Sequence, residues 1–172
     1  DMGGLDLLFN NAGIVLHKSA YDVTPVEWAK VINVNLNGEY YMASEFARYL
    51  KGKGKKGAIC NTASMSGHIV NWPQEQASYN ASKAAVIQMT RSLAVEYCKD
   101  GIRVNCISPG YMYTELTCHV NPDWQERWMD LTPYGRYGTP DELCGAVIYL
   151  LSDSASFTSG TDIIVDGCFT CV

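Results

Sequence analysis

The sequence has little positive charge and no long apolar run, and both shortages limit what the protein can be. Its 172 residues carry 13 basic and 18 acidic side chains, a formal net charge of −5. General nucleic-acid binding needs a basic face, which this balance does not favour. No apolar run approaches the roughly 18 residues of a membrane-spanning helix, and the first residues lack the features of a signal peptide. We therefore expect no nucleic-acid partner and no membrane partner.

Paired cysteines and clustered metal ligands are also missing. The seven cysteines are odd in number and scattered, and several lie in apolar runs. This usage is typical of free, mostly buried thiols in a reducing compartment, so we expect a cytoplasmic protein. Cys168 and Cys171 have C-x-x-C spacing, but neither a second ligand pair nor a helix start accompanies them. We expect no redox function and no metal site there.

What the sequence does contain is an alternation of strand and helix patterns. Hydrophobic residues make up 47% of the chain, enough for the core of one domain. Thr24, Pro25 and Glu27 have the spacing of a capping box at a helix start. Strands are predicted at 5–10, 57–63, 102–108 and 161–165, helices at 25–50, 77–98 and 139–151, and a short helical lid at 115–130. This order predicts an α/β fold with a parallel sheet covered on both faces.

Tyr79 and Lys83 have the spacing of a general acid/base pair. Four residues apart in the predicted helix 77–98, they lie on one face. A lysine ammonium beside a phenol favours the phenolate and lowers the tyrosine pKa toward neutrality, as proton exchange between alcohol and ketone requires. Tyr49 and Lys53 repeat the spacing but run into a Gly/Lys turn, so we interpret that pair as coincidental.

Polar and turn residues follow three of the predicted strands. Asn11 follows the first strand, Ser64 the second, and Pro109 and Gly110 the third. Ligands of open parallel sheets bind beyond the carboxyl ends of the strands. The sequence therefore predicts that these residues and Tyr79 meet at one crevice.

These motifs together resemble the short-chain dehydrogenase/reductase family, in its single-domain oxidoreductase branch. They are Asn10-Asn11-Ala12-Gly13, Asn35 within the segment 33–38, Ser64, Tyr79-x-x-x-Lys83, Pro109-Gly110 and Val165-Asp166-Gly167. They follow the family's order along the whole chain. The resemblance implies a Rossmann-like, doubly wound parallel sheet in three α/β/α layers. It also implies hydride transfer with NADP or NAD as the cofactor.

The resemblance also implies a role for each matched residue. Tyr79 would exchange the proton with the ketone or alcohol, and Lys83 would lower the pKa of Tyr79 and bind the nicotinamide ribose. Ser64 would hold the substrate oxygen, and Asn35 would anchor a water that passes protons to Lys83. Three asparagines within 33–37 predict a local bend of that helix. The implied cofactor contacts are Asn11, Ala12, Gly13, Tyr79, Lys83, Pro109, Gly110, Met112 and Thr114.

The segment 64–80 is similar to the sugar and polyol reductases of the family, which act on sorbose, xylulose, arabinitol and mannitol, with gluconate 5-dehydrogenases nearby. No lysine or arginine lies between Ser64 and Tyr79, which disfavours a phosphorylated substrate. Asn71, Gln74 and Gln76 offer uncharged groups that can read hydroxyls. The aromatic residues of the lid either stack on a sugar or pack inward. The expected substrate contacts are Ser64, Met65, Trp72, Gln76 and Tyr111.

The family's Gly-rich phosphate loop, and the residue that selects NAD or NADP, have no counterpart in this sequence. The strand 5–10 resembles the family's fourth strand, which suggests roughly 80–90 residues upstream. We therefore expect residues 1–172 to be a single domain, the C-terminal two-thirds of a Rossmann-like domain without its first strands, in which strand 5–10 is an apolar edge. Cys168 stands where the family often has a second glycine.

Three functions remain open at this stage. The first is an NAD(P)-dependent reductase of small ketoses and polyols. The second is a reductase of another carbonyl, such as a 3-oxoacyl thioester or a gluconate-type keto acid. The third is a non-catalytic fragment or regulatory protein that keeps the fold, against which the retained tyrosine, lysine, serine and asparagine argue. Helices 25–50 and 77–98 resemble those through which family members form tetramers, so a homo-tetramer is expected by analogy.

Overall fold

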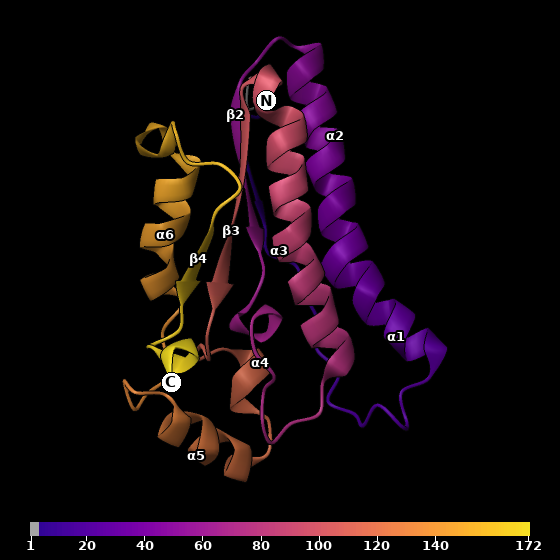
Figure 1. Cartoon of the computed structure of the whole chain (residues 1–172), viewed down its shortest axis with the longest axis vertical. Helices are drawn as coiled ribbons and strands as arrows, with labels where there is room; N and C mark the ends of the chain where they lie inside the picture. The colour runs from indigo at the N-terminus through magenta and orange to yellow at the C-terminus, as the bar shows by residue number, and fades with distance from the viewer. Residues whose placement is uncertain (1–3) are drawn as a thin grey trace.

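The computed structural model describes residues 4–172, and its strands form one parallel sheet in the order β1-β2-β3-β4 (Figure 1). The strands are β1 (Leu7–Asn10), β2 (Gly57–Thr62), β3 (Ile102–Pro109) and β4 (Asp162–Val165). Because all three pairings are parallel, each connection must cross over the sheet, and helices make these crossovers. The carboxyl ends of all four strands therefore lie at one end of the molecule.

Helices cover both faces of the sheet, which confirms the predicted three-layer α/β fold. The helices α2 (Glu39–Gly52) and α3 (Ala77–Tyr97) lie on one face, and α6 (Asp141–Leu151) lies on the other (Figure 1). The short helices α4 (Glu115–Cys118) and α5 (Pro122–Leu131) lie beyond the carboxyl ends of the strands and divide the predicted lid in two. Residues 1–3, which the predicted domain includes, lie outside the described residues.

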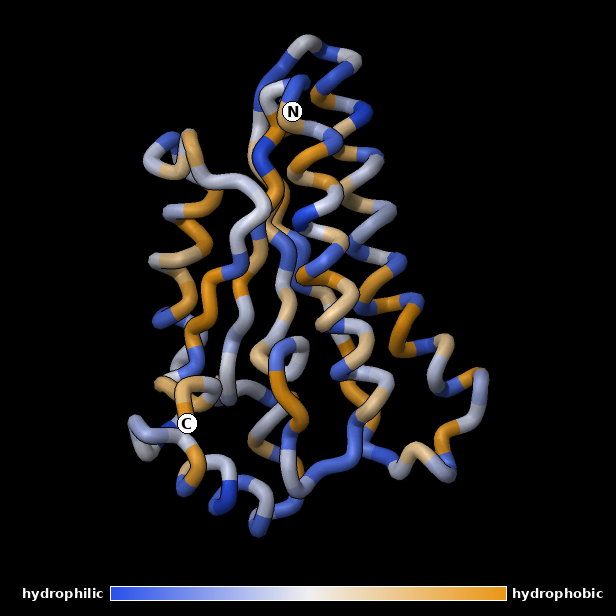
Figure 2. The backbone as a smooth tube through the Cα atoms, in the orientation of Figure 1, coloured by the Kyte–Doolittle hydropathy of each residue, from blue (hydrophilic) through white to orange (hydrophobic). Residues whose placement is uncertain are grey.

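Apolar side chains form clusters on both faces of the sheet, and the hydropathy colouring of the backbone shows hydrophobic positions along the strands and the helices that cover them (Figure 2). On one face, Ala43, Phe46 and Leu50 of α2 pack with Leu93 of α3 against the strands. On the other face, Cys60, Ile107 and Leu150 form the centre of the layer under α6. The seven cysteines are free thiols, but the prediction that most are buried was wrong, because only Cys60 and Cys106 lie in the core. The core thus fixes the helices on the strands and leaves the carboxyl ends of the strands for other contacts.

The predicted helix 25–50 is interrupted in its middle. The capping box of Thr24 and Glu27 is confirmed at the start of α1 (Pro25–Ile32). A π-helical segment, η1 (Asn33–Gly38), then leads into α2. The wider turn of a π-helix adds a residue and rotates the positions that follow. The irregularity predicted from the three asparagines is therefore present as a π-helical turn, and it decides which residues of α2 face inward.

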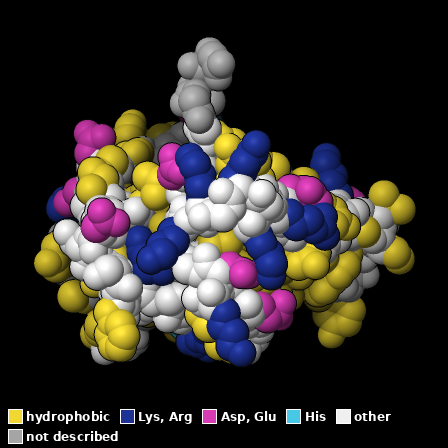
Figure 3. Space-filling model, turned by 90° about the horizontal axis from the view of Figure 1, so that it is seen from above, with side chains coloured by type: hydrophobic (Ala, Val, Ile, Leu, Met, Phe, Trp, Pro, Cys, Tyr) yellow, Lys and Arg dark blue, Asp and Glu magenta, His cyan; other side chains and the backbone are white. Residues whose placement is uncertain are grey.

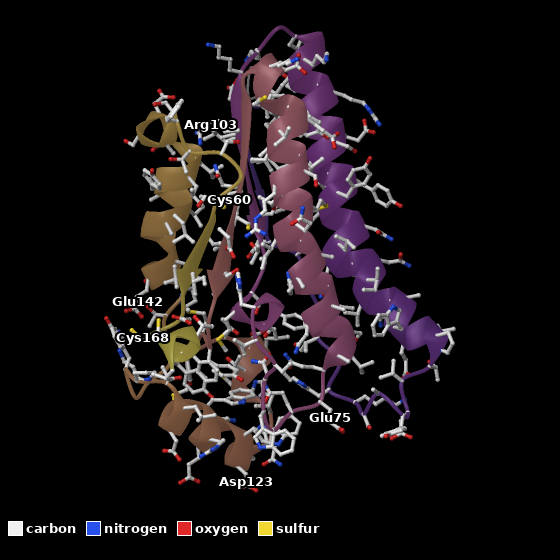
Figure 4. The ribbon with its side chains drawn as sticks, in the orientation of Figure 1. Cys60, Glu75, Arg103, Asp123, Glu142 and Cys168 are labelled. Carbon is white, nitrogen blue, oxygen red and sulfur yellow. The ribbon has the colours of Figure 1, made fainter. Side chains whose placement is uncertain are left out.

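The remaining boundaries differ from the predictions by one or two residues. Strand β1 begins at Leu7, α3 ends at Tyr97, β3 continues to Pro109, and α6 begins at Asp141. Side chains of the predicted apolar edge are exposed, with Leu7 at 55% and Phe9 at 40%. Cys168, labelled in Figure 4, has a left-handed backbone with φ of 68°, which explains why a glycine suits that position.

The opposite end of the molecule carries the Gly/Lys turn and is charged (Figure 3). Lys51 pairs with Asp100 and Lys55 with Asp6, each at 3.0 Å. Nearby, Arg103 donates to the carbonyls of Leu150 and Ser152 and so ties β3 to the end of α6 (Figure 4). Within residues 4–172, no helix is long and apolar enough to cross a membrane.

Candidate active site

A cavity of about 330 Å³ opens at the carboxyl ends of the strands. It brings together most of the residues predicted for the site, from three strand ends and the start of α3. The predicted residues that line it are Asn11, Gly13, Ser64, Met65, Gln76, Tyr79, Lys83, Pro109, Gly110, Tyr111, Met112 and Thr114. The predicted convergence of the strand ends is thus present in the structure.

Three predicted residues do not line the cavity. Ala12 is exposed between two lining residues, and Asn35 is fully buried behind the cavity. Trp72 is 66% exposed and belongs to a separate hollow that also contains Trp124. The prediction of Trp72 as a substrate contact therefore finds no support in this arrangement, because its ring lies outside the cavity.

Lys83 and Tyr79 lie side by side on the first turns of α3. The Lys83 ammonium is 5.9 Å from the centre of the Tyr79 ring and donates to the Thr62 carbonyl at 2.5 Å. The Ser64 hydroxyl accepts a hydrogen bond from the Ser66 amide at 3.1 Å, which starts a short 3₁₀ turn, η2 (Met65–Gly67). Ser64, Tyr79 and Lys83 therefore face the same space.

The pKa of Tyr79 differs from the sequence-based expectation. Spacing alone predicted a lowered pKa, but enclosure by the protein disfavours the phenolate and raises the pKa of Tyr79. A hydrogen bond with Ser64 acts in the opposite direction, and the negative charge of Glu39 raises the pKa further. The expectation was wrong for this structure because it ignored desolvation and the carboxylate near Lys83.

Glu39 is the residue near this site that the sequence analysis missed. Its Oε1 atom lies 3.5 Å from Lys83 Nζ, and the two side chains are only 2% and 3% exposed. Burial raises the pKa of Glu39 to about 7, although the Lys83 charge opposes that rise. Burial likewise lowers the pKa of Lys83, and Glu39 opposes that change. A signal was present, because Glu39 continues the spacing of Ala43, Phe46 and Leu50 on the buried side of α2.

Asn35 holds the loop after β1 in place from within the π-helical turn. Its Oδ1 accepts from the Ile14 amide at 2.8 Å, and its Nδ2 donates to the Ile14 carbonyl at 2.9 Å and to Ser82 Oγ at 3.0 Å. The side chain thus joins the loop, η1 and α3. Its implied role as the anchor of a water stays a prediction.

The amides predicted to bind substrate hydroxyls form hydrogen bonds with other side chains of the protein. Asn71 and Gln74 donate to the Tyr111 hydroxyl at 3.0 and 2.8 Å, and Gln76 donates to Asn71 at 3.0 Å. The Trp128 indole donates to Gln74 at 3.0 Å, and its ring stacks on Tyr111 with centroids 4.2 Å apart. The inward-packing alternative for the lid is therefore the one seen for Trp128.

Gly67 is a second position that the sequence analysis gave no role of its own. A Cβ atom there would lie 2.8 Å from Ile87 Cδ1 and 2.9 Å from the Ala84 amide nitrogen. Real Cβ atoms do not approach backbone atoms so closely, so only glycine lets η2 lie against α3. This contact sets the position of Ser64 relative to Tyr79.

We predict that Gly67→Ala separates η2 from α3 and lowers kcat of the full-length protein by about 10²-fold, the cost of a 1 Å misplacement. Steady-state kinetics with a carbonyl substrate measures this loss. Gly145→Ala in α6 is the control, because nothing lies within 4 Å of the added Cβ. That control is expected to stabilise the protein by about 0.5–1 kcal/mol. Equal kcat values for both variants would show that the close packing of Gly67 is unimportant.

Among residues 4–172, no group of three or more histidine, cysteine, aspartate or glutamate side chains is placed to hold a metal ion. The lining of the cavity carries little charge. Lys83 is the only lysine, arginine, aspartate or glutamate among the described residues that line it. The remaining lining is apolar, hydroxyl or amide, apart from the imidazole of His17.

Comparison with known proteins gives consistent matches along the chain. Residues 1–170 match the family model described as enoyl-(acyl carrier protein) reductase. The chain is 49% identical over 169 residues to sorbose reductase of Schizosaccharomyces pombe, covering 97% of this chain and 66% of that protein. It is 47% identical over 173 residues to a probable NADP-dependent mannitol dehydrogenase of Yarrowia lipolytica, covering 99% and 62%. The chain thus spans slightly less than two thirds of these relatives' length.

Solved structures are similar over the same extent. A short-chain type dehydrogenase/reductase from Mycobacterium marinum superposes with a TM-score of 0.96 at 42% identity, covering 99% of this chain and 67% of that one. A gluconate 5-dehydrogenase from Burkholderia cenocepacia, in complex with NADP and tartrate, superposes with a TM-score of 0.93 at 34% identity, covering 99% and 67%. Fold and sequence therefore agree on the same group of proteins.

Proposed function

The chain belongs to the short-chain dehydrogenase/reductase family, and from this premise we propose that the full-length protein is an NAD(P)-dependent oxidoreductase. It would interconvert the ketone and secondary alcohol of a small ketose or polyol. The observation that carries the proposal is that Ser64, Tyr79 and Lys83 line one cavity at the carboxyl ends of the strands. A binding protein that had lost catalysis would have no need of all three.

The residues around the cavity fit a nicotinamide cofactor. Gly13 lies so close to the site that its Cβ would be 3.6 Å from both Asn35 Oδ1 and Lys83 Nζ. Gly110 has no room for a side chain, since a Cβ would lie 2.7 Å from Asp166 Cα. Bare backbone at two strand ends suits the close approach of a flat ring and its ribose. Asn11, Ala12, Gly13, Pro109, Gly110, Met112 and Thr114 would hold the cofactor, together with Tyr79 and Lys83.

The nicotinamide would supply the hydride chemistry, and the side chains would handle the proton and the substrate oxygen. Tyr79 would donate its phenolic proton to the ketone oxygen, or accept the proton of the alcohol. Ser64 would hydrogen-bond to the same oxygen and stabilise the negative charge that develops on it. Lys83 would bind the ribose and stabilise the phenolate, and Asn35 would anchor a water on the route to Lys83.

The substrate class follows from the character of the cavity. Ser64, Met65, Gln76 and Tyr111 are the proposed contacts, and Lys83 is the only lysine, arginine, aspartate or glutamate of residues 4–172 that lines the cavity. A phosphorylated substrate would call for more positive charge than this. The relatives are named for sorbose and mannitol, uncharged polyhydroxylated compounds. A gluconate-type keto acid is the second candidate, because the Burkholderia relative is named for gluconate.

A substrate panel tests the proposal. The full-length protein is mixed with NADPH or NADH and, separately, a ketose, a 5-keto acid and a 3-oxoacyl thioester, and consumption of the reduced cofactor is measured. We expect the highest kcat/KM for the ketose. Turnover of the acyl thioester without turnover of any ketose would contradict the proposal.

We also propose that the full-length protein is a homo-tetramer. Light scattering on the same preparation tests this directly, because it measures the mass of the assembly.

A further inference from the structure

Glu39 is an acidic residue in a position that otherwise belongs to the apolar core. The buried side of α2 continues with Ala43, Phe46, Ala47 and Leu50, at the spacing of one helical face. Glu39 begins this row and is only 3% exposed. A carboxylate without a partner in such a place is costly, whereas an apolar side chain would cost nothing. A buried carboxylate at this position therefore needs a neighbouring cation.

Lys83 is that partner. Its ammonium lies 3.5 Å from Glu39 Oε1, and the Thr62 backbone is the other group that acts on the carboxylate as a hydrogen-bond partner. The other titratable groups that act on this pair are Tyr79 on α3, the thiol of Cys60 on β2 and the thiol of Cys106 on β3. The contact from β1 is the Asn10 amide, which donates to the Glu39 carbonyl. None of these groups is a cation.

The π-helical turn is what brings the carboxylate to this place. Glu39 follows Gly38, the last residue of η1. One residue of a regular helix corresponds to a rotation of roughly 100°, so an α-helix lacking the extra residue would turn Glu39 away from Lys83. Asn35 is bonded to Ser82 on α3 from the same turn. The π-helical turn therefore positions two contacts with α3, that of Glu39 with Lys83 and that of Asn35 with Ser82.

We propose that Glu39 is a positioning residue for the ketone–alcohol reaction: its carboxylate is the buried counter-charge that keeps Lys83 protonated and aimed at the Thr62 carbonyl and Tyr79. The inference rests on the proposed function, because Lys83 and Tyr79 have catalytic parts only there. Glu39 does not line the cavity and acts through Lys83. Without the carboxylate, Lys83 would be a buried cation with only a carbonyl beside it.

The sign of the effect on pH dependence follows. The negative charge of Glu39 raises the pKa of Lys83 and that of Tyr79. Removing the Glu39 charge lowers both pKa values, so Lys83 and Tyr79 each lose their proton at a lower pH. Reduction of a ketone needs the ammonium and the phenolic proton. The alkaline limb of the kcat profile for reduction should therefore move toward lower pH.

The first test is Glu39→Gln, which keeps the shape and removes the charge. We expect the alkaline limb of kcat for ketone reduction to move down by about one pH unit, so that kcat on the alkaline side of the limb falls about tenfold, with KM changing less. Glu45→Gln is the matched control, since Glu45 lies on the same helix and pairs with Arg48 at the surface. A fall in kcat with an unmoved limb would show a packing role only and would overturn the proposal.

The second test measures stability and needs no activity, so it separates failure of this proposal from failure of the proposed function. Lys83→Met alone leaves a buried carboxylate unpaired and should lower Tm, and Glu39→Gln alone leaves a buried ammonium unpaired. The double variant removes both charges. We expect its Tm to lie above the value obtained by adding the two single losses. Losses that are strictly additive, or a double variant less stable than their sum, would overturn the proposal.

Discussion

Tyr79→Phe is expected to lower kcat of the full-length protein by about 10²–10⁴-fold, the usual contribution of a positioned general acid or base. The change removes a single oxygen atom, so the ring can keep its place on α3 beside Lys83. Cofactor binding should weaken only slightly, because the ring and the lining of bare backbone remain. Turnover of the reduced nicotinamide measures the rate, and a fluorescence titration measures cofactor affinity.

Tyr49→Phe is the matched control for this prediction. Tyr49 and Lys53 share the four-residue spacing, but Tyr49 packs against the core cluster of α2, away from the cavity. The control should keep wild-type kcat and nearly wild-type stability. Full activity in Tyr79→Phe would remove Tyr79 from the reaction, whereas absence of activity in the wild-type full-length protein would favour the non-catalytic reading of the fold.

The position of the cavity could be predicted from the sequence because it depends on topology. Strands of a parallel sheet must end at the same side, so Asn11, Ser64 and Pro109, each at or just beyond the end of a strand, had to come together. The capping box at Thr24 could be predicted for a similar reason, since its bonds join residues three apart. Features fixed by chain direction or by local spacing are readable without a structure.

Features fixed by contacts between distant residues were not predictable in the same way. Glu39 and Lys83 are 44 residues apart in number and meet only because a π-helical turn rotates α2. The pKa of Tyr79 could not be predicted from Lys83 alone, because enclosure by other elements determines its direction. The amide groups of Asn71 and Gln74 were expected to face substrate, yet Tyr111 accepts from both.

Trp128→Ala is expected to be the most destabilising single change in the lid, at about 3–5 kcal/mol. Trp128 is 2% exposed and is the largest of the fully buried side chains. Its loss removes the stack on Tyr111 and leaves the Gln74 carbonyl without its donor. Thermal unfolding should show a fall of about 2–4 °C in Tm for each kcal/mol. KM for a ketose should also rise, because Tyr111 loses the surface that holds it in the cavity wall.

Two further variants separate the stack from the hydrogen bond. Trp128→Phe keeps an aromatic face for Tyr111 but has no N–H for Gln74, so its cost should be about 1–3 kcal/mol, that of one unsatisfied buried acceptor. Trp72→Ala truncates a tryptophan that is 66% exposed and outside the cavity, and it should leave Tm and KM close to wild type. A rise in KM for Trp72→Ala alone would return Trp72 to the substrate contacts. Equal Tm values for Trp128→Ala and Trp72→Ala would mean that the Tyr111–Trp128 stack does not hold the lid on the sheet.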